Sequence, residues 1–170
     1  PVPQPALAAR PSKLRPSSLK GAEKAAMPAR IKPQLATPSP VPPNGSGWLH
    51  EIKLDGYRTA AHFQGGGVTF ITRAGLDWTR RYGTLNQAFS DLPCREAVID
   101  GEIVVLDEHG VTHFADLQQA LSDGAGERLT FYAFDLLHLD GYDLRQVGLA
   151  RRKAMLARLV GPVVTSSSAL

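Results

Sequence analysis

Residues 48–72, which read WLHEIKLDGYRTAAHFQGGGVTFIT, decide the fold of the chain. Three runs rich in apolar, aromatic and β-branched residues alternate here with two glycine-bearing turns. Short runs of this composition between glycine turns are typical of strands joined in hairpins. The expected strands are 48–54, 59–63 and 68–72, and the expected turns are Asp55-Gly56 and the glycines 65–67.

The rest of the chain adds further strands and several helices. Tyr82, Leu85 and Phe89 are spaced by three and four residues, which predicts a helix over 79–92 that Pro93 ends. Because hairpins outnumber long crossovers, we expect an α+β domain with a largely antiparallel sheet and flanking helices. The other expected elements are strands at 97–106 and 130–137 and helices at 114–121 and 149–160.

Composition limits the class of protein. The 170 residues are 43% hydrophobic and 21% charged, which allows one domain with a true core. Apolar runs stay far below the roughly 20 residues that a membrane helix needs, and residues 1–30 lack the apolar region of a signal peptide. Cys94 is the single cysteine, which excludes an internal disulfide and a cysteine-rich zinc site. We therefore expect a cytoplasmic protein.

The N-terminal part differs from the remainder. Eleven of the 13 prolines lie before residue 44, and residues 1–47 hold seven basic residues and one acidic residue. Few large apolar side chains occur there, so little burial can offset the entropy lost on ordering. This composition predicts a disordered, basic, proline-rich linker over 1–30 and a domain from 31 onward. The segment could join a further module or be a plain flexible terminus.

A cluster of charged residues precedes the second predicted strand. If 48–54 is a strand, Glu51, Lys53 and Asp55 project from one face. Lysine is a poor nucleophile until desolvation or a nearby cation lowers its pKa, and Asp55 could orient the amine or accept its proton. An ion pair on an exposed edge strand is the commoner origin of such a pattern.

Two further clusters interrupt apolar strands. Asp100 and Glu102 share one face of the predicted strand 97–106, where carboxylates need an ion pair or a metal. Phe134 lies in a strand beside Asp135, and an aromatic ring there could stack on a base or simply fill the core. Arg73 could contact a phosphate or a ribose, although a surface arginine is equally compatible with the sequence.

Together these clusters could form one site for nucleotidyl transfer. The amine would attack the α-phosphorus of a nucleoside triphosphate, and pyrophosphate would leave. Mg²⁺, held by few carboxylates and by the phosphates, would offset the developing charge.

Four segments in this order and spacing resemble the nucleotidyltransferase domain of ATP-dependent DNA ligases, in particular the ligase module of bacterial end-joining ligase D. The segments are WLHEIKLDGYR (48–58), ITRAGLDWTRRY (71–82), VIDGEIVVLDEHG (98–110) and FYAFDLLHLDGYDLR (131–145). The resemblance runs from about residue 32 to the end of the chain. It implies an ATP-grasp-like fold and an ATP-dependent DNA ligase of DNA repair and recombination.

The resemblance assigns the chemistry to three residues. Lys53 matches the nucleophile that forms a lysyl-AMP phosphoramidate, and Asp55 matches the carboxylate that assists it. Glu102 matches the carboxylate near the ribose and the metal, and Asp55 is the second candidate metal ligand.

The resemblance also assigns the contacts to the nucleotide. Glu51 falls where the family contacts the adenine amino group, and Phe134 matches the ring that stacks on adenine. Arg58 and Arg73 match arginines that contact a phosphate, the ribose or the nick. The implied cofactors are ATP and Mg²⁺ (or Mn²⁺).

The implied partners are nicked or broken double-stranded DNA, polymerase or phosphoesterase modules, and an end-binding protein. Family domains continue with a glutamate-glycine motif, paired lysines and an oligonucleotide-binding-fold domain, which residues 161–170 do not match. We therefore expect a C-terminally incomplete adenylation domain over 31–170, with weak or no activity. The alternatives are a non-catalytic fragment that binds nucleotide or DNA, and a lysine-dependent nucleotidyltransferase of the RNA ligase or capping type.

Overall fold

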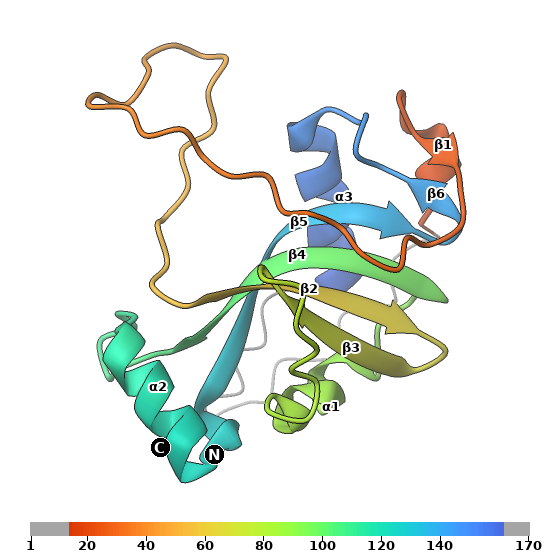
Figure 1. Cartoon of the computed structure of the whole chain (residues 1–170). Helices are drawn as coiled ribbons and strands as arrows, with labels where there is room; N and C mark the ends of the chain where they lie inside the picture. The colour runs from red at the N-terminus through yellow and green to blue at the C-terminus, as the bar shows by residue number, and fades with distance from the viewer. Residues whose placement is uncertain (1–13, 162–170) are drawn as a thin grey trace, which may run out of the picture.

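The computed structural model describes residues 14–161, and its centre is a six-stranded sheet in which every pair of neighbouring strands is antiparallel (Figure 1). The strands are β1 (Glu23–Lys24), β2 (Tyr57–Gln64), β3 (Gly67–Thr72), β4 (Glu96–Val105), β5 (Leu129–Leu139) and β6 (Tyr142–Asp143). Their order across the sheet is β1-β6-β5-β4-β2-β3. The expected α+β class with a largely antiparallel sheet is confirmed.

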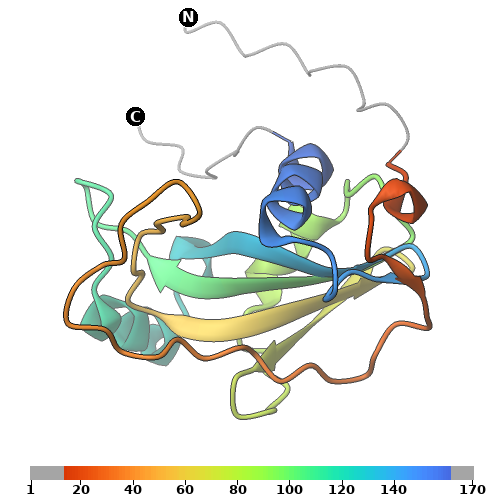
Figure 2. The ribbon, with the colours of Figure 1, turned by 90° about the horizontal axis from the view of Figure 1, so that it is seen from above.

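Helices flank the sheet. In Figure 1, α1 and α2 lie below the sheet, whereas α3 passes behind β5, and Figure 2 shows α3 beside β5 from above. No helix of residues 14–161 is long and apolar enough to cross a membrane. The helices are α1 (Asn86–Phe89), α2 (Phe114–Asp123) and α3 (Leu149–Val160), and the 3-10 turns are η1 (Pro16–Ser18), η2 (Gly83–Leu85) and η3 (Gly126–Arg128).

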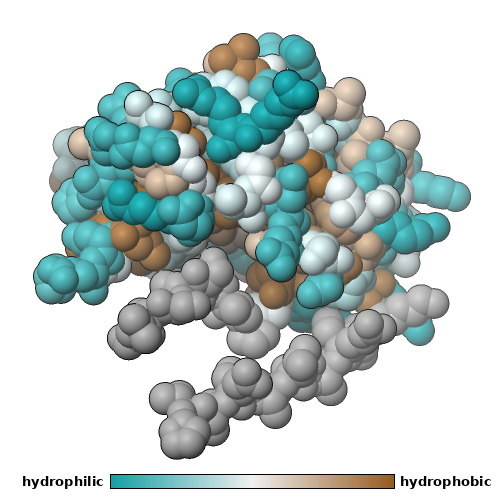
Figure 3. Space-filling view, turned by 90° about the horizontal axis from the view of Figure 1, so that it is seen from below, coloured by the Kyte–Doolittle hydropathy of each residue, from teal (hydrophilic) through white to brown (hydrophobic). Residues whose placement is uncertain are grey.

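The core lies between the sheet and the helices α1, α2 and α3, whose buried side chains belong to one hydrophobic cluster. An aromatic cluster fills it, with the Phe70 ring centroid 5.4 Å from that of Phe89 and 6.1 Å from that of Phe131. Gly101 of β4 makes room for this cluster, because a Cβ there would lie 2.4 Å from Phe131 Cζ. Seen from below, the outer surface is mainly hydrophilic with small hydrophobic patches (Figure 3).

The strand expected over 48–54 is absent, and these residues form an extended loop instead. Trp48 is 57% exposed and Ile52 is 87% exposed. The loop leads directly into β2, whose two edges are already paired with β3 and β4. The β2–β4 ladder ends at Tyr57↔Ile103, although β4 continues to Val105. The N–H groups of Asp55 and Gly56 donate to the side chains of Thr112 and Glu102 instead of to the β4 backbone, so the residues before β2 do not continue the strand.

The helix expected over 79–92 is reduced to η2 and α1. Asp77 forms an isolated bridge with Ile71, and the Trp78 N–H donates to the Phe70 carbonyl at 2.9 Å. The Thr79 hydroxyl oxygen accepts from the Phe70 N–H, also at 2.9 Å. These bonds hold residues 77–79 in an extended form beside β3, so helical structure begins only at Gly83.

The N-terminal segment differs from the linker expectation over its described part, residues 14–30. Leu14 is buried in the core, and β1 pairs with β6 through Glu23↔Asp143 and Lys24↔Tyr142. The segment is ordered because its backbone pairs with β6. Backbone pairing does not require an apolar period, so the composition does not predict it. Residues 1–13 of the expected linker lie outside the described residues.

Candidate functional site

An open groove of 1490 Å³ lies between the loop 31–56, the strands β2, β4 and β5, and the start of α3. The volume of the groove exceeds the usual range for small-molecule sites, so a nucleotide fits within the groove. Six of the seven residues selected from the sequence line it: Glu51, Lys53, Arg58, Arg73, Glu102 and Phe134.

Lys53 is exposed on the loop that borders the groove. Within residues 14–161, no hydrogen bond or ion pair holds its ammonium group. The loop reaches β4 at Gly56, whose N–H donates to Glu102 Oε1 at 3.1 Å. Only glycine allows this approach, because a Cβ at position 56 would lie 2.1 Å from the Ile103 carbonyl oxygen. Gly56 thus allows residues 48–56, which we call the lysine loop, to lie against the Glu102 carboxylate of β4.

Glu102 is half-buried in the groove, and burial raises the pKa of its carboxyl. The Gly56 N–H and the charges of Arg58 and Lys53 act in the opposite direction. A desolvated carboxylate with one oxygen already bonded can offer the other to a cation. Among residues 14–161 no group of three or more His, Cys, Asp or Glu side chains could hold a metal ion. A single carboxylate completed by substrate phosphates is nevertheless an ordinary arrangement for Mg²⁺, and Glu102 fits it.

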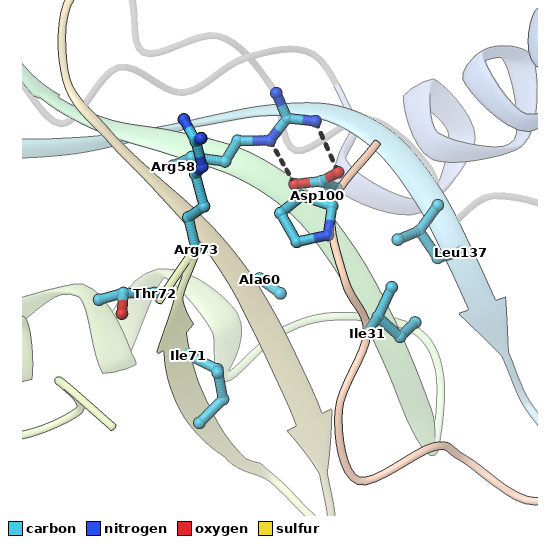
Figure 4. Close-up of a pocket in the computed structure, with 9 residues that line it drawn as sticks. Ile31, Arg58, Ala60, Ile71, Thr72, Arg73, Asp100 and Leu137 are labelled. Carbon is cyan, nitrogen blue, oxygen red and sulfur yellow. Dashed lines mark hydrogen bonds and ion pairs between the residues drawn. The ribbon is translucent and has the colours of Figure 1, made fainter. Parts of the chain in front are cut away.

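Arg58 forms a bidentate ion pair with Asp100, with Nε–Oδ1 at 2.7 Å and Nη2–Oδ2 at 2.8 Å (Figure 4). Burial lowers the pKa of Arg58, but the Asp100 carboxylate more than reverses this and leaves the pKa raised. The guanidinium carbon also lies 4.2 Å from the centroid of the Phe134 ring. Of the alternatives open for Asp100, the ion pair with an arginine is the one that the structure contains.

Arg73 follows β3, and its side chain is exposed at the groove. Its N–H donates to the Arg58 carbonyl at 3.0 Å, which fixes the two arginines on adjacent strands. Figure 4 shows both side chains beside a small cavity of 10 Å³ that Ile31 also lines, room for about one water molecule.

Asp55 does not share the face of Lys53, and it does not line the groove. Its carboxylate Oδ2 accepts from the N–H of Phe114, the first residue of α2, at 3.3 Å, and its own N–H donates to Thr112 Oγ1 at 3.1 Å. A carboxylate is favoured at a helix N-terminus, which carries free N–H groups and a partial positive charge. The alternation that was expected to align Asp55 with Lys53 fails because residues 48–55 are not a strand.

Phe134 occupies a β-bulge in β5. Asp100 of β4 pairs with Asp135, and the next residue, Gly101, pairs with Ala133, so Phe134 is the extra residue. A bulge re-aims a side chain and leaves its own backbone outside the regular ladder. The bulge explains how an aromatic residue inside an apolar strand reaches the groove.

Two cations of α3 were not recognised as site residues from the sequence. Arg152 forms a bidentate ion pair with Asp135, at 2.8 Å for both contacts, and also donates to the Val147 carbonyl. Lys153 donates to the Phe134 carbonyl at 2.7 Å and forms an ion pair with Glu51. Because Asp135 lies inside an apolar strand, the sequence indicates that it needs a cationic partner. No local pattern identifies Arg152 as that partner.

Comparisons with known proteins identify the family of the chain. A family model described as "ATP dependent DNA ligase domain" matches residues 33–169. The multifunctional non-homologous end joining protein LigD of Pseudomonas aeruginosa is 43% identical over 141 residues, which cover 83% of this chain and 17% of the relative. The LigD of Mycobacterium tuberculosis is 38% identical over 130 residues, covering 76% of this chain and 17% of the relative. The chain therefore spans about a sixth of the length of these relatives.

Solved structures give the same result. The crystal structure of the ligase domain from M. tuberculosis LigD is 37% identical with a TM-score of 0.57, covering 64% of this chain and 36% of that chain. A mycobacterial DNA ligase D complexed with ATP and MES matches with a TM-score of 0.56 at 37% identity, covering 64% and 35%. By its family model, its relatives and its fold, the chain belongs to the ATP-dependent DNA ligase family and is similar to the ligase domain of ligase D.

Proposed function

We propose that residues 31–170 form part of the adenylation domain of a DNA ligase that acts in end joining, and that the groove binds ATP. The observation that carries this proposal is the convergence of six side chains on one groove: an amine, two carboxylates, two guanidinium groups and one aromatic ring. The related mycobacterial DNA ligase D is complexed with ATP, which supports the same ligand here.

In the proposed reaction Lys53 is the nucleophile. Its amine forms a P–N bond to the α-phosphorus of ATP while the bond between that phosphorus and the bridging oxygen breaks. Pyrophosphate leaves with the electron pair, and two of the three protons of the ammonium group pass to solvent, so that the phosphoramidate nitrogen keeps one. The lack of an ion pair on Lys53 within residues 14–161 supports this role, because a carboxylate partner would stabilise the unreactive ammonium form.

ATP would be held by the remaining groove residues. Glu51 accepts from the adenine amino group, Phe134 stacks on the adenine ring, and Arg58 and Arg73 contact a phosphate, the ribose or the nick. Guanidinium groups suit these contacts because they offer several donors in a fixed plane.

Glu102 is the first residue that we assign to a divalent cation, Mg²⁺ or Mn²⁺, which would neutralise phosphate charge when bound. Asp55 is proposed to assist Lys53 by fastening the end of the lysine loop to α2 through its two hydrogen bonds. A role of Asp55 as a second metal ligand would require its carboxylate to leave the Phe114 N–H and turn into the groove.

In the complete protein, AMP would next move to the 5′-phosphate of nicked or broken DNA, and a 3′-hydroxyl would displace it to seal the strand. Polymerase or phosphoesterase modules and an end-binding protein are the proposed partners, because the related proteins are named as multifunctional end-joining proteins. DNA and ATP are both cytoplasmic in bacteria, the source of these relatives, so we propose a cytoplasmic location.

The test is self-adenylation. The chain is incubated with α-labelled ATP and Mg²⁺, and acid-labile label on the protein is measured for the wild type, Lys53→Ala and Lys20→Ala. Lys20 is exposed and remote from the groove, so it controls for the loss of one positive charge. We expect label on the wild type and on Lys20→Ala but not on Lys53→Ala.

Three other results would change the proposal. Label that persists in Lys53→Ala would remove Lys53 from its role, and label from GTP but not from ATP would favour the capping type. ATP binding without label would favour the second candidate, a non-catalytic nucleotide-binding fragment.

A further inference from the structure

The loop that carries Glu51 and Lys53 has few attachments to the rest of the domain. Trp48 and Ile52 are mostly exposed, so burial contributes little to fixing its position. Its C-terminal end is fastened by Asp55 and Gly56, through the bonds to α2 and β4. In the middle of the loop, the side-chain attachment that the structure contains is the ion pair between Glu51 and Lys153 of α3.

Lys153 makes a second contact, to the bulge in β5. Its Nζ donates at 2.7 Å to the carbonyl oxygen of Phe134, the residue that the β4–β5 ladder leaves out of register. A carbonyl outside the ladder needs another donor when it is half-buried. Lys153 therefore supports the backbone of the residue whose ring faces the groove.

One ammonium group thus joins two parts of the site that are remote in sequence. Lysine has three donors, and two of them are used here, one on Glu51 and one on Phe134. The Lys153 side chain is 26% exposed, so water screens its contacts only in part. These contacts therefore stabilise the site more than those of a fully exposed pair would.

The contact also determines what Glu51 can offer to the groove. A carboxylate in its ionised form only accepts hydrogen bonds. Lys153 bonds to Oε1, so Oε2 is available to accept from a donor in the groove. An acceptor-only group held at a fixed point selects a base that presents an amino group there.

We propose that Lys153 is a positioning residue that sets the distance between Glu51 and the Phe134 ring, and thereby the preference for a 6-aminopurine. The inference rests on the proposed function, in which these two residues contact adenine. Lys153 itself touches neither the base nor the reacting atoms.

Two measurements on the chain test this proposal, with Lys153→Gln, the conservative variant Lys153→Arg, and Arg151→Gln as the matched control. Arg151 is an exposed cation on the same helix, and its side chain makes no contact that bears on the groove. Each glutamine variant removes one positive charge from α3.

The first measurement needs no nucleotide. Trypsin cleavage after Lys53, followed by mass spectrometry, reports the mobility of the loop. Cleavage after Arg128, the last residue of η3, requires access to the bond to the buried Leu129 of β5 and therefore reports opening of the sheet. We expect Lys153→Gln to accelerate cleavage after Lys53 by about three- to tenfold, an order-of-magnitude expectation for losing one partly buried charged contact. Cleavage after Arg128 should not change, and Arg151→Gln should behave as the wild type.

The second measurement is calorimetric binding of ATP and of purine riboside triphosphate, which lacks the 6-amino group. The wild type should prefer ATP by about tenfold or more, as expected for one hydrogen bond to a charged group. Lys153→Gln should lose most of this preference, whereas Lys153→Arg should restore much of it and Arg151→Gln should keep it.

The outcomes separate the two proposals. Unchanged cleavage after Lys53 in Lys153→Gln would overturn the positioning role, whatever the nucleotide data show. Faster cleavage with an unchanged preference for ATP would overturn the effect on specificity. A wild type that does not distinguish the two triphosphates would refute the proposed adenine contacts and the specificity, while the cleavage rates would still decide whether Lys153 holds the loop.

Discussion

Replacing Arg152 with methionine is expected to destabilise the fold by about 3 kcal/mol. The Arg152 and Asp135 side chains are only 12% and 16% exposed, and they are joined by two contacts of 2.8 Å. Methionine retains most of the apolar volume but leaves the Asp135 carboxylate and the Val147 carbonyl without this donor. Breaking one partner of a buried pair costs about 3–5 kcal/mol, and the residual exposure places this pair at the lower end.

The measurement is urea unfolding followed by tryptophan fluorescence and circular dichroism. The double variant Arg152→Met, Asp135→Leu removes both charges and should recover most of the loss, because the penalty comes from the unpaired carboxylate. The control is Arg145→Met: Arg145 pairs with Asp143 but is 52% exposed, so its loss should cost less than about 1 kcal/mol. A cost below 1 kcal/mol for Arg152→Met, or a double variant less stable than the single one, would refute this reasoning.

Three further changes have defined outcomes. Gly56→Ala places a Cβ 2.1 Å from the Ile103 carbonyl oxygen, so it should push the lysine loop away from β4 and weaken ATP binding by about tenfold or more in calorimetry. Gly101→Ala places a Cβ 2.4 Å from the Phe131 ring and should destabilise the fold by about 1–3 kcal/mol in urea, a loss that Phe131→Leu in the same chain should reduce. Burial, with a smaller effect of a neighbouring histidine, lowers the pKa of His62 below its ordinary 6.5, so its contribution to stability is present above pH 6.5 and is lost as the pH falls below that value. Urea midpoints between pH 7.5 and 5 should fall more steeply for the wild type than for His62→Gln, and equal slopes would contradict this assignment.

The elements that the sequence predicted well are those whose pattern is local. Strands expected at 59–63, 68–72, 97–106 and 130–137 all lie within observed strands or differ from them by one residue, and the helix at 149–160 has the expected bounds. Each has either a glycine turn at its boundary or a clear apolar period, and each finds a partner in the sheet or the core.

The elements that were wrong depend on pairing partners that a single sequence does not specify. The run 48–54 has the composition of a strand, but the backbone that joins it to β2 bonds to the side chains of Thr112 and Glu102 and does not continue the ladder with β4. Bonds to β3 hold the chain around residue 78 beside that strand. The helix that the spacing around Tyr82 predicts is therefore shorter than expected. In residues 14–30, pairing of β1 with β6 imposes order on a segment with little apolar content.

The site shows the same division. Motif order was sufficient to select six residues that share the groove, because the motifs lie at fixed places on adjacent strands and on the loop. Asp55 was placed by an alternation that requires a strand. Lys153 was not recognised as a site residue, because an amphipathic period separates polar from apolar positions but does not identify the cation that reaches Glu51.

Because Phe134 is an extra residue in β5, a change at this position can alter the groove without altering the core. Deleting Phe134 would leave Ala133 opposite Gly101 and Asp135 opposite Asp100, which gives ordinary antiparallel register from Val105 to Ile99, where the second irregularity of this strand pair begins. A single-residue deletion there would preserve the alternation of side chains that builds the core while removing the ring from the groove. A change of length is therefore tolerable to the scaffold at this point of the strand, although it would abolish the aromatic surface on which a base could lie.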